Sequence, residues 1–413
     1  MSFYKRGLLL SAFALCSVTA WGKNVCENVI SSSDIVNCAE RMSPDVLGSE
    51  AEINVKKGQV EASGQLLNPE LSLQSTTGTL QSERRTETDV SLAFPIEIGG
   101  KRSARKQVAQ AEFLKSGKEL EIKRAEGRKN VILKLNRLRQ IYDELALVEE
   151  SRETFAKLLR QYQGRPALSP EQEVSLTVFR TARGDYNFKK ISYEEELGAL
   201  ASFFRVSTGL TLEQVKKALP PKISKWPTLN VTVPEAKASP LSALYEADVA
   251  VAQGELDQAK GDAWPTLMVG PSAKFTQEPG GDMQQWGVNL SMPLPVLSLN
   301  GGSKAAAAAG VQSAQLKRDQ WLEQIAERRL LLEKSYRATV DSLNENPNGH
   351  ELEQRHVKIE SQFMRGLISS ALVIEAHRSL VDYAKSRNEH EMKALETYLE
   401  IQVIDGQQVE LKL

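Results

Sequence analysis

Histidines are the side chains of this sequence that most readily suggest metal chemistry. The four histidines are His350, His356, His377 and His390. None of them stands in a ligand pattern such as two histidines four residues apart beside a glutamate. We therefore expect surface or helix-packing histidines, and we predict neither a metal site nor a cofactor.

Motifs for phosphate binding and nucleophilic catalysis are also missing. The runs Gly99-Gly100-Lys101 and Gly301-Gly302-Ser303-Lys304 lack the spacer and the Lys-Ser/Thr order of a P-loop. The sequence contains no nucleophile elbow and no metalloprotease motif. We therefore predict that the protein is not an enzyme.

The first residues have the pattern of an export signal, which we predict over 1–22. Lys5 and Arg6 precede an apolar stretch at 7–18, and Ala20 and Gly22 offer small residues for cleavage. The apolar stretch is short for a membrane anchor, which is one alternative. Lipidation at Cys16 is the other.

Two cysteines remain after cleavage, in an N-terminal arm that we place at 23–42. Export implies an oxidising compartment, so Cys26 and Cys38 are expected to form a local disulfide. Two free thiols are the alternative. In both cases the pair suggests a structural staple rather than reactive chemistry.

The composition excludes several classes of protein. The 52 Lys+Arg and 53 Asp+Glu residues nearly cancel, which argues against a nucleic-acid binder. The counts of 26 Gly, 16 Pro and 3 Cys exclude collagen-like and disulfide-scaffold chains. Beyond the signal there is no run of about 18 apolar residues, so no transmembrane helix is predicted. By composition alone the mature chain looks soluble.

The elements that must position any site come from a tandem duplication. Residues 43–71 align without gaps to residues 239–267. Each copy opens with Ser-Pro, a helix cap followed by proline at the first helical position. We predict short helices over 44–67 and 240–263, each ending before a second proline.

A pair of strands follows each short helix, over 71–98 and 267–296. Apolar and polar residues alternate in segments of about ten residues, which is typical of strands with one apolar face. The side chains expected on the apolar face, which would face a membrane, are Val90, Leu92, Phe94, Val269, Phe275, Trp286, Val288, Leu290 and Met292.

Each strand pair leads through a Gly-Gly turn into a long helix. The turns lie at 99–100 and 301–302. Val131, Leu135 and Leu138 begin a spacing of apolar residues that is typical of a coiled-coil seam. We therefore predict a long helical arm in each copy.

Second glycine turns, near 164 and 366, reverse the chain at the tip of each arm. The return limbs, at about 169–207 and 370–403, are shorter than the outgoing arms, and the short opening helices could stack end to end on them. Pro347 is expected to kink or divide the second arm. Each copy is thus a long helical hairpin.

These elements divide the mature chain into consecutive segments. The segments are the N-terminal arm 23–42, the first repeat 43–209, a Pro-rich connector 210–238, the second repeat 239–405 and a C-terminal tail 406–413.

Four strands with one apolar face raise a physical problem. Unpaired sheet edges in hydrocarbon cost several kcal/mol per backbone group. The smallest membrane barrels have eight strands, so a lipid-facing sheet would have to be shared between copies of the chain. The alternative is a soluble protein whose hairpins pack on its own helices. The export signal, the strand lengths and the alternation favour the membrane.

Several motifs, in this order and spacing, resemble the TolC-like outer membrane factors of Gram-negative efflux and type I secretion systems. The resemblance covers essentially the whole mature chain. The Pro95–Arg102 run looks most like the branch that accompanies cobalt–zinc–cadmium cation pumps. The motifs are the duplication, Asn68-Pro69-Glu70-Leu71, the run from Phe94 to Arg102, and Gly366-Leu367-Ile368-Ser369 followed by Ile374-Glu375-Ala376.

The resemblance implies a mostly α fold with a small β part. Three chains would share a twelve-stranded transmembrane β-barrel, to which each gives four strands, and their duplicated helical hairpins would form a periplasmic α-barrel. The implied function is that of an outer membrane channel subunit, a passive duct in a tripartite export system. The implied partners are two further copies, a periplasmic adaptor, an inner-membrane pump of the resistance-nodulation-division type and outer membrane lipid, with no nucleic acid. Heavy-metal cations are the substrate that the branch suggests.

The resemblance also implies a periplasmic gate after the second tip. In the family, acidic residues just past this turn line the constriction. When the family's motif is aligned from Gly366, its two acidic positions correspond to Leu372 and Glu375, and only Glu375 carries a charge. Three copies of one carboxylate around an axis would attract cations. A solvated carboxylate on a helix face is the alternative.

The tips and the start of the first long helix complete the candidate sites. We predict that the tips contact the adaptor, with simple chain reversal as the alternative. A basic group, Lys101, Arg102, Arg105 and Lys106, either meets lipid phosphates, sets the charge of the lumen or forms a solvated helix face. The tip residues are Gly164, Arg165, Pro166, Ser169, Arg365, Gly366, Leu367 and Ser369.

A soluble periplasmic coiled-coil adaptor or scaffold is the alternative function. Such an adaptor would usually show one helical hairpin flanked by β-rich modules. A strand pair in each of two repeats favours the channel.

Overall fold

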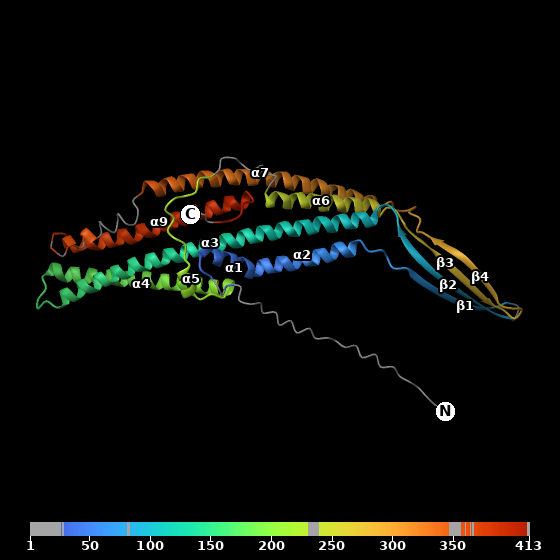
Figure 1. Cartoon of the computed structure of the whole chain (residues 1–413), viewed down its shortest axis with the longest axis horizontal. Helices are drawn as coiled ribbons and strands as arrows, with labels where there is room; N and C mark the ends of the chain where they lie inside the picture. The colour runs from blue at the N-terminus through green and yellow to red at the C-terminus, as the bar shows by residue number, and fades with distance from the viewer. Residues whose placement is uncertain are drawn as a thin grey trace, which may run out of the picture.

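The computed structural model is an elongated bundle of long helices with a narrow sheet at one end (Figure 1). The expected signal peptide 1–22, with Cys16, and the tip residue Gly366 lie outside the described residues. No helix within the described part of the chain is long and apolar enough to cross a membrane. The described residues are 26, 29–80, 83–229, 239–346, 357–359, 361–363, 365 and 367–410.

The helices of the first repeat and its flanks begin at the prolines and capping residues that the sequence predicts. Proline stands at the start of α2 and of α4, and the Ser169 hydroxyl accepts a hydrogen bond from the Gln172 amide to cap α4. Two helices were not predicted, α1 in the N-terminal arm and α5 in the connector. The helices are α1 (Ser32–Met42), α2 (Pro44–Ser63), α3 (Lys101–Gln163), α4 (Pro170–Thr208) and α5 (Leu212–Lys217).

The second repeat contains the corresponding helices, with one interruption. Helix α7 ends at Glu345, and Asn346 is extended, because a residue before proline avoids the helical conformation. This end lies where Pro347 predicts a break, while Pro347 itself is outside the described residues. The helices are α6 (Pro240–Gly261), α7 (Gly301–Glu345) and α9 (Ser370–Ile404).

Helix α3 is the central rod of the bundle. Near the sheet the helices are neighbours in the order α2–α3–α6–α7, and toward the tips the order is α4–α3–α9–α7. Figure 1 shows α4 and α2 following one another along α3, and α9 and α6 following one another along α7. The short opening helices therefore continue the line of the return limbs.

The core lies where α3 meets α4, α9 and α1. Val131, Leu135 and Leu138 of the expected seam are buried there, together with Phe155 of α3 and Phe179 of α4. Burial of such large apolar side chains stabilises a fold by about 1.5–3 kcal/mol each. The long arms are therefore held by a continuous seam of side chains rather than by helix propensity alone.

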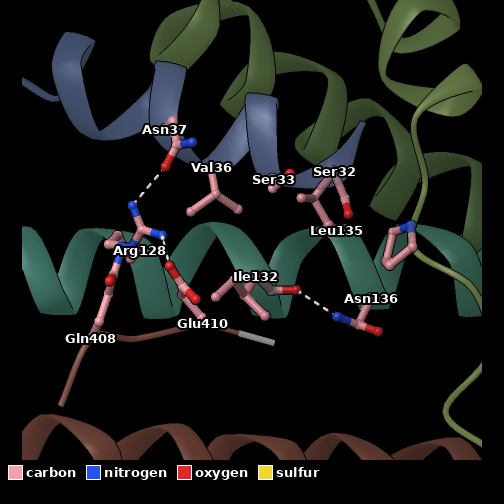
Figure 2. A pocket seen from close by; sticks show the side chains of 11 residues that line it. Ser32, Ser33, Val36, Asn37, Arg128, Ile132, Leu135, Asn136, Gln408 and Glu410 are labelled. Carbon is pink, nitrogen blue, oxygen red and sulfur yellow. Dashed lines mark hydrogen bonds and ion pairs between the residues drawn. The ribbon is translucent and has the colours of Figure 1, made fainter. Parts of the chain in front are cut away.

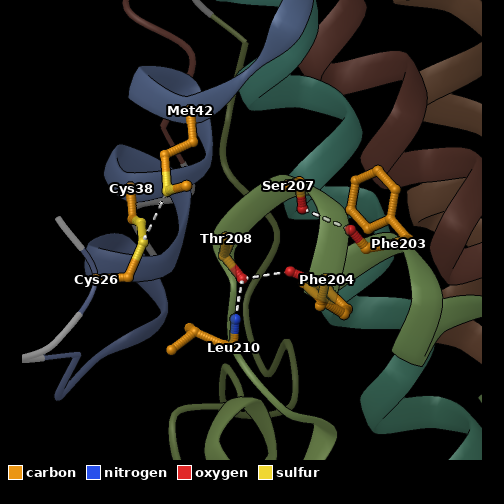
Figure 3. Close-up of a disulfide and its surroundings, with 8 residues drawn as sticks. All are labelled: Cys26, Cys38, Met42, Phe203, Phe204, Ser207, Thr208 and Leu210. Carbon is orange, nitrogen blue, oxygen red and sulfur yellow. Dashed lines mark hydrogen bonds between the residues drawn. A yellow bond between two sulfur atoms is a disulfide. The ribbon is translucent and has the colours of Figure 1, made fainter. Parts of the chain in front are cut away.

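A belt of shorter segments surrounds the middle of the bundle. It consists of α1, α5, residues 218–229 and the C-terminal residues 405–410. Cys26 and Cys38 form a disulfide in this belt, with their Cα atoms 5.7 Å apart. Figure 3 shows the bond beside Met42, whose Sδ lies 3.6 Å from the Cys26 Sγ. The disulfide fastens the start of the described chain to α1.

The four strands form one antiparallel sheet in the order β1–β2–β3–β4. Central pairing joins the two repeats, because Val90 of β2 lies opposite Ala273 of β3. On the outer sides, Leu73 lies opposite Val90, and Trp286 lies opposite Ala273. The strands are β1 (Glu70–Leu80), β2 (Glu83–Glu97), β3 (Thr266–Gln277) and β4 (Met283–Ser291).

Prolines explain where the strands differ from the expected lengths. Strand β4 ends at Ser291 rather than near 296, because Pro293 and Pro295 have no N–H to donate to a neighbouring strand. Met292 therefore lies past the end of β4. In the middle of β3, Gly270 and Pro271 interrupt the pairing with β2, and a Cβ on Gly270 would collide with the Leu92 carbonyl oxygen.

Candidate functional site

One face of the sheet is apolar and uncovered. Residues directly opposite one another across antiparallel strands share a face, so the register puts the expected apolar side chains of β2, β3 and β4 together and adds Leu71 and Leu73 of β1 to them. Trp286, Val288 and Leu290 of β4 are 77%, 77% and 65% exposed. Figure 1 shows the sheet extending beyond the helices, and within the described chain no helix covers this face. An apolar face of this size needs a partner that is itself apolar.

The opposite face of the sheet is polar. Glu87 of β2 contacts Arg85 at 2.9 Å and Lys274 of β3 at 2.5 Å, so its carboxylate bridges two cations. Asp89 lies directly opposite Lys274 on the same face. Among the described residues, β1 and β4 each pair on one side only, which leaves two open edges.

The expected basic group forms the junction between the sheet and α3. Arg105 holds the Glu97 carboxylate through two hydrogen bonds, Lys101 Nζ lies 3.3 Å from the Thr266 hydroxyl, and Arg102 Nε donates to the Gly64 carbonyl at 2.7 Å. These three cations therefore have protein partners, whereas Lys106 is exposed. Their first role is to fix the angle at which the chain passes from strand to helix.

Glycine is required at this junction. Gly99 and Gly100 have φ angles of 76° and 77°, in the left-handed region that glycine tolerates best. The Trp264 ring packs on Gly99 so closely that a Cβ there would collide with it. Trp264 is nevertheless 57% exposed.

A polar groove that the sequence reasoning missed runs between α4 and α9. On its floor, Arg137 of α3 donates to Glu196 of α4 at 2.7 and 2.9 Å and to Glu144 at 2.9 Å. Asn388 of α9 donates to the same Glu144 oxygen at 2.7 Å. Burial raises the pKa of Tyr193, which faces Glu144. The available sequence signal was the heptad spacing of Arg137 and Glu144 beside the apolar seam.

The groove and the polar face of the sheet are linked through α3. Lys101 and Arg105 bond Thr266 of β3 and Glu97 of β2, at the end of the sheet nearest the helices. About ten helical turns separate Lys101 from Arg137. Beside Arg137, the groove has a volume of about 460 Å³, and its lining from α4 and α9 mixes charged residues with the aromatic rings of Phe188 and Tyr193 and with Val381.

The structure brings the two tips together. The Ser175 and Ser370 hydroxyls are 3.0 Å apart, and the Phe179 and Phe363 rings meet edge to face at 6.2 Å. Of the expected tip residues, Gly164, Arg165, Pro166, Ser169, Arg365, Leu367 and Ser369 are exposed, and Gly366 lies outside the described residues.

Glu375 projects from α9 just beyond the second tip. Its side chain is 62% exposed, and its carboxylate lies 3.8 Å from Arg378 Nη1. Asp382 follows one heptad later on the same stripe and contacts Lys189 of α4 at 3.1 Å, on the groove side. Glu375 therefore lies on the stripe that faces the groove, and Leu372, which is 51% exposed, precedes it by one turn.

The described histidines fit the packing and surface roles expected of them. His377 is fully buried against Phe155, and its Nδ1 lies 3.0 Å from the Ser151 hydroxyl. Burial raises the pKa of the neighbouring Tyr186 to about 12, so this phenol stays neutral. His390 is exposed, while His350 and His356 lie outside the described residues. Among the described residues, no group of three or more His, Cys, Asp or Glu could hold a metal ion.

Comparisons with known proteins agree with this architecture. Residues 35–167 match the family model of the outer membrane efflux proteins. Over this region the chain is similar to the TolC-like outer membrane factors. The match to outer membrane efflux proteins supports a location in the outer membrane with a large periplasmic helical part.

Solved structures show how far the fold of this chain is shared. The CmeC outer membrane channel of Campylobacter jejuni matches with a TM-score of 0.73 and 13% identity, over 95% of this chain and 91% of that one. VceC of Vibrio cholerae gives 0.70 and 14%, over 92% and 97%. The open state of the MtrE channel of Neisseria gonorrhoeae gives 0.68 and 8%, over 92% and 90%. No curated protein sequence matches the chain significantly.

Proposed function

We propose that three copies of this chain form a passive duct through the outer membrane and the periplasm, which serves a tripartite export system. The observation that carries the proposal is the sheet, with one uncovered apolar face, one polar face and two open edges. In a membrane, such edges must be paired, because unpaired backbone groups in hydrocarbon cost several kcal/mol each. Copies of the same chain provide matching edges.

The helices support the same closure. Both layers have the same lateral order, with β1 and α2 at one margin and β4 and α7 at the other. A contact that joins β4 to β1 of the next copy therefore also joins α7 to α2 and α4. Exposed apolar residues on these margins, such as Phe188 of α4 (75%) and Leu331 of α7 (68%), would be covered by it.

In this duct, the two faces of the sheet would have different surroundings. The apolar face, with Val90, Leu92, Phe94, Val269, Phe275, Trp286, Val288 and Leu290, would meet lipid, and Met292 would lie at its periplasmic margin. The polar face and the groove beside Arg137 would line a water-filled lumen. Charged side chains remain hydrated in such a lumen, which avoids the cost of burying them in lipid.

The two ends of the duct have different proposed roles. The exposed tips at 164–169 and 365–369 would contact the periplasmic adaptor, and through it the inner-membrane pump. Glu375 would form one acidic ring of three carboxylates at the periplasmic opening. Arg378, 3.8 Å away in the same chain, would reduce the negative potential of this ring.

The proposed exported substrates are heavy-metal cations, and this narrower proposal is supported only by the resemblance of the Pro95–Arg102 run to the cation-efflux branch. A passive duct needs little substrate chemistry of its own. Deletion of the gene should therefore lower tolerance to Co²⁺, Zn²⁺ or Cd²⁺ more than tolerance to organic toxicants. Lower tolerance to organic toxicants alone would contradict the metal assignment but would leave the duct in place.

Conductance in planar bilayers tests the duct and its gate. The purified full chain should run as a heat-sensitive trimer in mild detergent and form cation-preferring pores. Glu375→Gln should lower the preference for cations, because it removes three carboxylates from the opening. Glu153→Gln is the matched control, since Glu153 is exposed on α3 and lies on the side opposite Phe155.

Fractionation separates this proposal from a soluble adaptor or scaffold. The duct requires the protein to sediment with outer membranes and to need detergent for extraction. Recovery of the chain in the periplasmic supernatant without detergent would overturn the proposal.

A further inference from the structure

An apolar stretch continues past the end of β4. Residues 292–299 join β4 to the start of α7 (Figure 1), and the sequence of this stretch contains no charged residue. Its apolar side chains are exposed, with 67% for Leu294, 79% for Val296 and 99% for Leu297. A contiguous exposed apolar surface of this kind marks an interaction site.

In the belt, by contrast, the chain covers its apolar side chains itself. Figure 2 shows Val36 of α1 with Ile132 and Leu135 of α3 around a cavity, and all three are buried. The stretch at 292–299 has the same kinds of side chain but lacks this packing. It therefore needs a second source of apolar surroundings.

Hydrogen bonds and packing fix the level of this stretch in the molecule. Asn300, just before α7, donates a hydrogen bond to a carbonyl in the last turn of α6 at 2.9 Å. The packing of Trp264 on Gly99 and the bond from Arg102 to the Gly64 carbonyl tie α6, α3 and α2 together in the same way. The sheet-side ends of four helices therefore lie together, directly beside the sheet.

Two other connectors carry exposed apolar side chains at this level. Leu66 and Leu67, between α2 and β1, are 73% and 48% exposed, and Trp264, between α6 and β3, is half exposed. Tryptophan is enriched where a membrane meets water. We call Leu66, Leu67, Trp264 and residues 292–299 the collar, because they lie together at the helix end of the sheet.

The apolar face of the sheet is too short to cross a membrane alone. Its longest run, from Phe275 to Leu267 on β3, advances eight residues, or about 26 Å along the strand. Barrel strands tilt by about 40°, so this run covers about 20 Å of an apolar band about 25 Å tall. Toward the loops the same face becomes polar, because Thr77, Thr86 and Gln277 lie opposite one another.

The collar supplies the missing height at the other end. From Trp286 of β4 to Val296 the chain advances ten residues, which gives about 33 Å along the strand and about 25 Å after the same tilt. The two prolines of the stretch keep the residues before them extended, so Met292 and Leu294 carry on from β4. The apolar surface thus reaches the height of the band only when the collar is included.

We propose that the collar is the rim of the lipid-facing surface and inserts into the inner leaflet of the outer membrane, where phospholipid chains cover it. This inference rests on the proposed duct. It moves the periplasmic margin of the apolar band from Met292 to Leu297, and it places the sheet-side ends of the helices among the phospholipid headgroups. Trp264 then lies at the boundary between hydrocarbon and water.

Lipid fits the collar better than a neighbouring copy does. In the proposed duct the next copy lies in the plane of the sheet, beside the edge of β4. Side chains of a strand stand perpendicular to that plane. Met292 and Leu294 continue the alternate set of Trp286, Val288 and Leu290, so they project out of the sheet toward the surrounding membrane.

Nitroxide labels on the collar test its surroundings directly. Leu294→Cys and Leu297→Cys are labelled separately in the mature chain, and the trimers are reconstituted into vesicles of phosphatidylethanolamine and phosphatidylglycerol. Cys26 and Cys38 are bonded to each other, and the parent chain, treated in the same way, measures background labelling. Power saturation then compares collisions with oxygen, which concentrates in lipid, and with a water-soluble nickel chelate.

Two matched positions calibrate the measurement. Val288→Cys, on the exposed apolar face of β4, reports contact with lipid. Leu114→Cys reports contact with water, because Leu114 is 65% exposed and lies about 20 Å along α3 from its start. The ratio of oxygen to nickel collisions at Leu294 and Leu297 should exceed that at Leu114 about tenfold, because a polar chelate is excluded from hydrocarbon.

The other outcomes separate this inference from the duct itself. Collar labels as open to nickel as the Leu114 label, with the Val288 label in lipid, would overturn the inference and leave the duct in place. Labels at both collar positions that are shielded from both reagents would assign the cover to the next copy of the chain, which also overturns it. A Val288 label that is open to nickel would remove the sheet from lipid, so the proposed duct would fail as well.

Discussion

Helices α2 and α6 are two copies of one sequence segment with different surroundings. Helix α6 lies between α3 and α7, whereas α2 contacts α3 and lies at the margin of the chain. The shared glycine shows the consequence. A Cβ on Gly254 of α6 would lie 2.8 Å from Val108 Cγ2, while a Cβ on Gly58 of α2 would meet nothing within 4 Å. The same residue is thus a packing requirement in one copy and an open surface in the other.

The same difference between central and marginal copies is found throughout both repeats. In the first repeat, β1 and α4 are marginal and β2 and α3 are central, whereas in the second repeat β3 and α9 are central and β4 and α7 are marginal. Duplication therefore reproduces the elements, and their position in the lateral order decides which side chains are constrained. Paired substitutions at corresponding positions test this difference.

The largest difference is expected between Gly270 of β3 and Gln74 of β1. Gly270→Val should destabilise the chain by about 3 kcal/mol or more, because the new Cβ collides with the Leu92 backbone across the central pair. Gln74→Val should change stability by no more than about 0.5 kcal/mol, because Gln74 is exposed on a marginal strand. Guanidinium midpoints and the amount of heat-sensitive trimer on gels measure both. Equal losses would show that β1 and β3 are constrained alike.

The next difference is expected between the two helix glycines. Gly254→Leu should cost about 2 kcal/mol, because the contact with Val108 must open. Gly58→Leu should gain up to about 1 kcal/mol of helix propensity within one chain. If α7 of a neighbouring copy packs on α2, Gly58→Leu should still weaken the trimer in a detergent titration. A Gly58→Leu trimer as stable as the parent would place the contact between copies elsewhere.

A pH-dependent difference is expected between Glu391 of α9 and Lys189 of α4, which lie equally far from the glycines of their tips. Burial raises the pKa of Glu391 above its usual 4.5, against the opposing effects of Arg139, Arg387 and Lys222. The folded chain then binds a proton more tightly than the unfolded chain. This contribution to stability is complete below pH 4.5 and is lost as the pH rises through the raised pKa.

Unfolding midpoints measured from pH 4.5 to neutrality check this expectation. Glu391→Gln should flatten the profile, because glutamine cannot take up the proton that the folded chain binds more tightly. Lys189→Gln is the matched control, because Lys189 pairs with Asp185 and Asp382 at the surface. An unchanged slope in Glu391→Gln would remove Glu391 from the account of pH dependence.

The smallest difference is expected at the helix caps of the two tips. Ser169 forms a capping box with Gln172 at the start of α4, whereas the Ser369 side chain makes no cap hydrogen bond to α9. Ser169→Ala should therefore cost about 1 kcal/mol, and Ser369→Ala only a few tenths. Hydrogen exchange of the first turns of α4 and α9 resolves effects of this size. A larger loss at Ser369 would reverse the comparison.

Much of the fold could be predicted from local sequence patterns. The alternation over 71–98 and 267–296 predicted strands, the Gly-Gly turns preceded both long helices, and Pro347 predicted the end of α7. These signals act within a few residues, since proline and glycine alter the backbone at their own position and side chains alternate along a strand. Two exceptions are α1 and α5, which the composition of the arm and the connector did not indicate. In α1 the local signal existed, because Ser31 and Asp34 form a capping box.

The sequence by itself determined the duplicated elements, their order and which alternate residues of the strands are apolar. Only the tertiary structure decided which copy of each element is central, that β2 pairs with β3 across the repeats, and that Arg137, Glu144 and Asn388 meet in one groove. The structure also contains the disulfide between Cys26 and Cys38, for which the sequence left two free thiols as an alternative. The physical reason is separation along the chain. Contacts between residues hundreds of positions apart depend on the packing of whole helices and strands, and no spacing within one element specifies them.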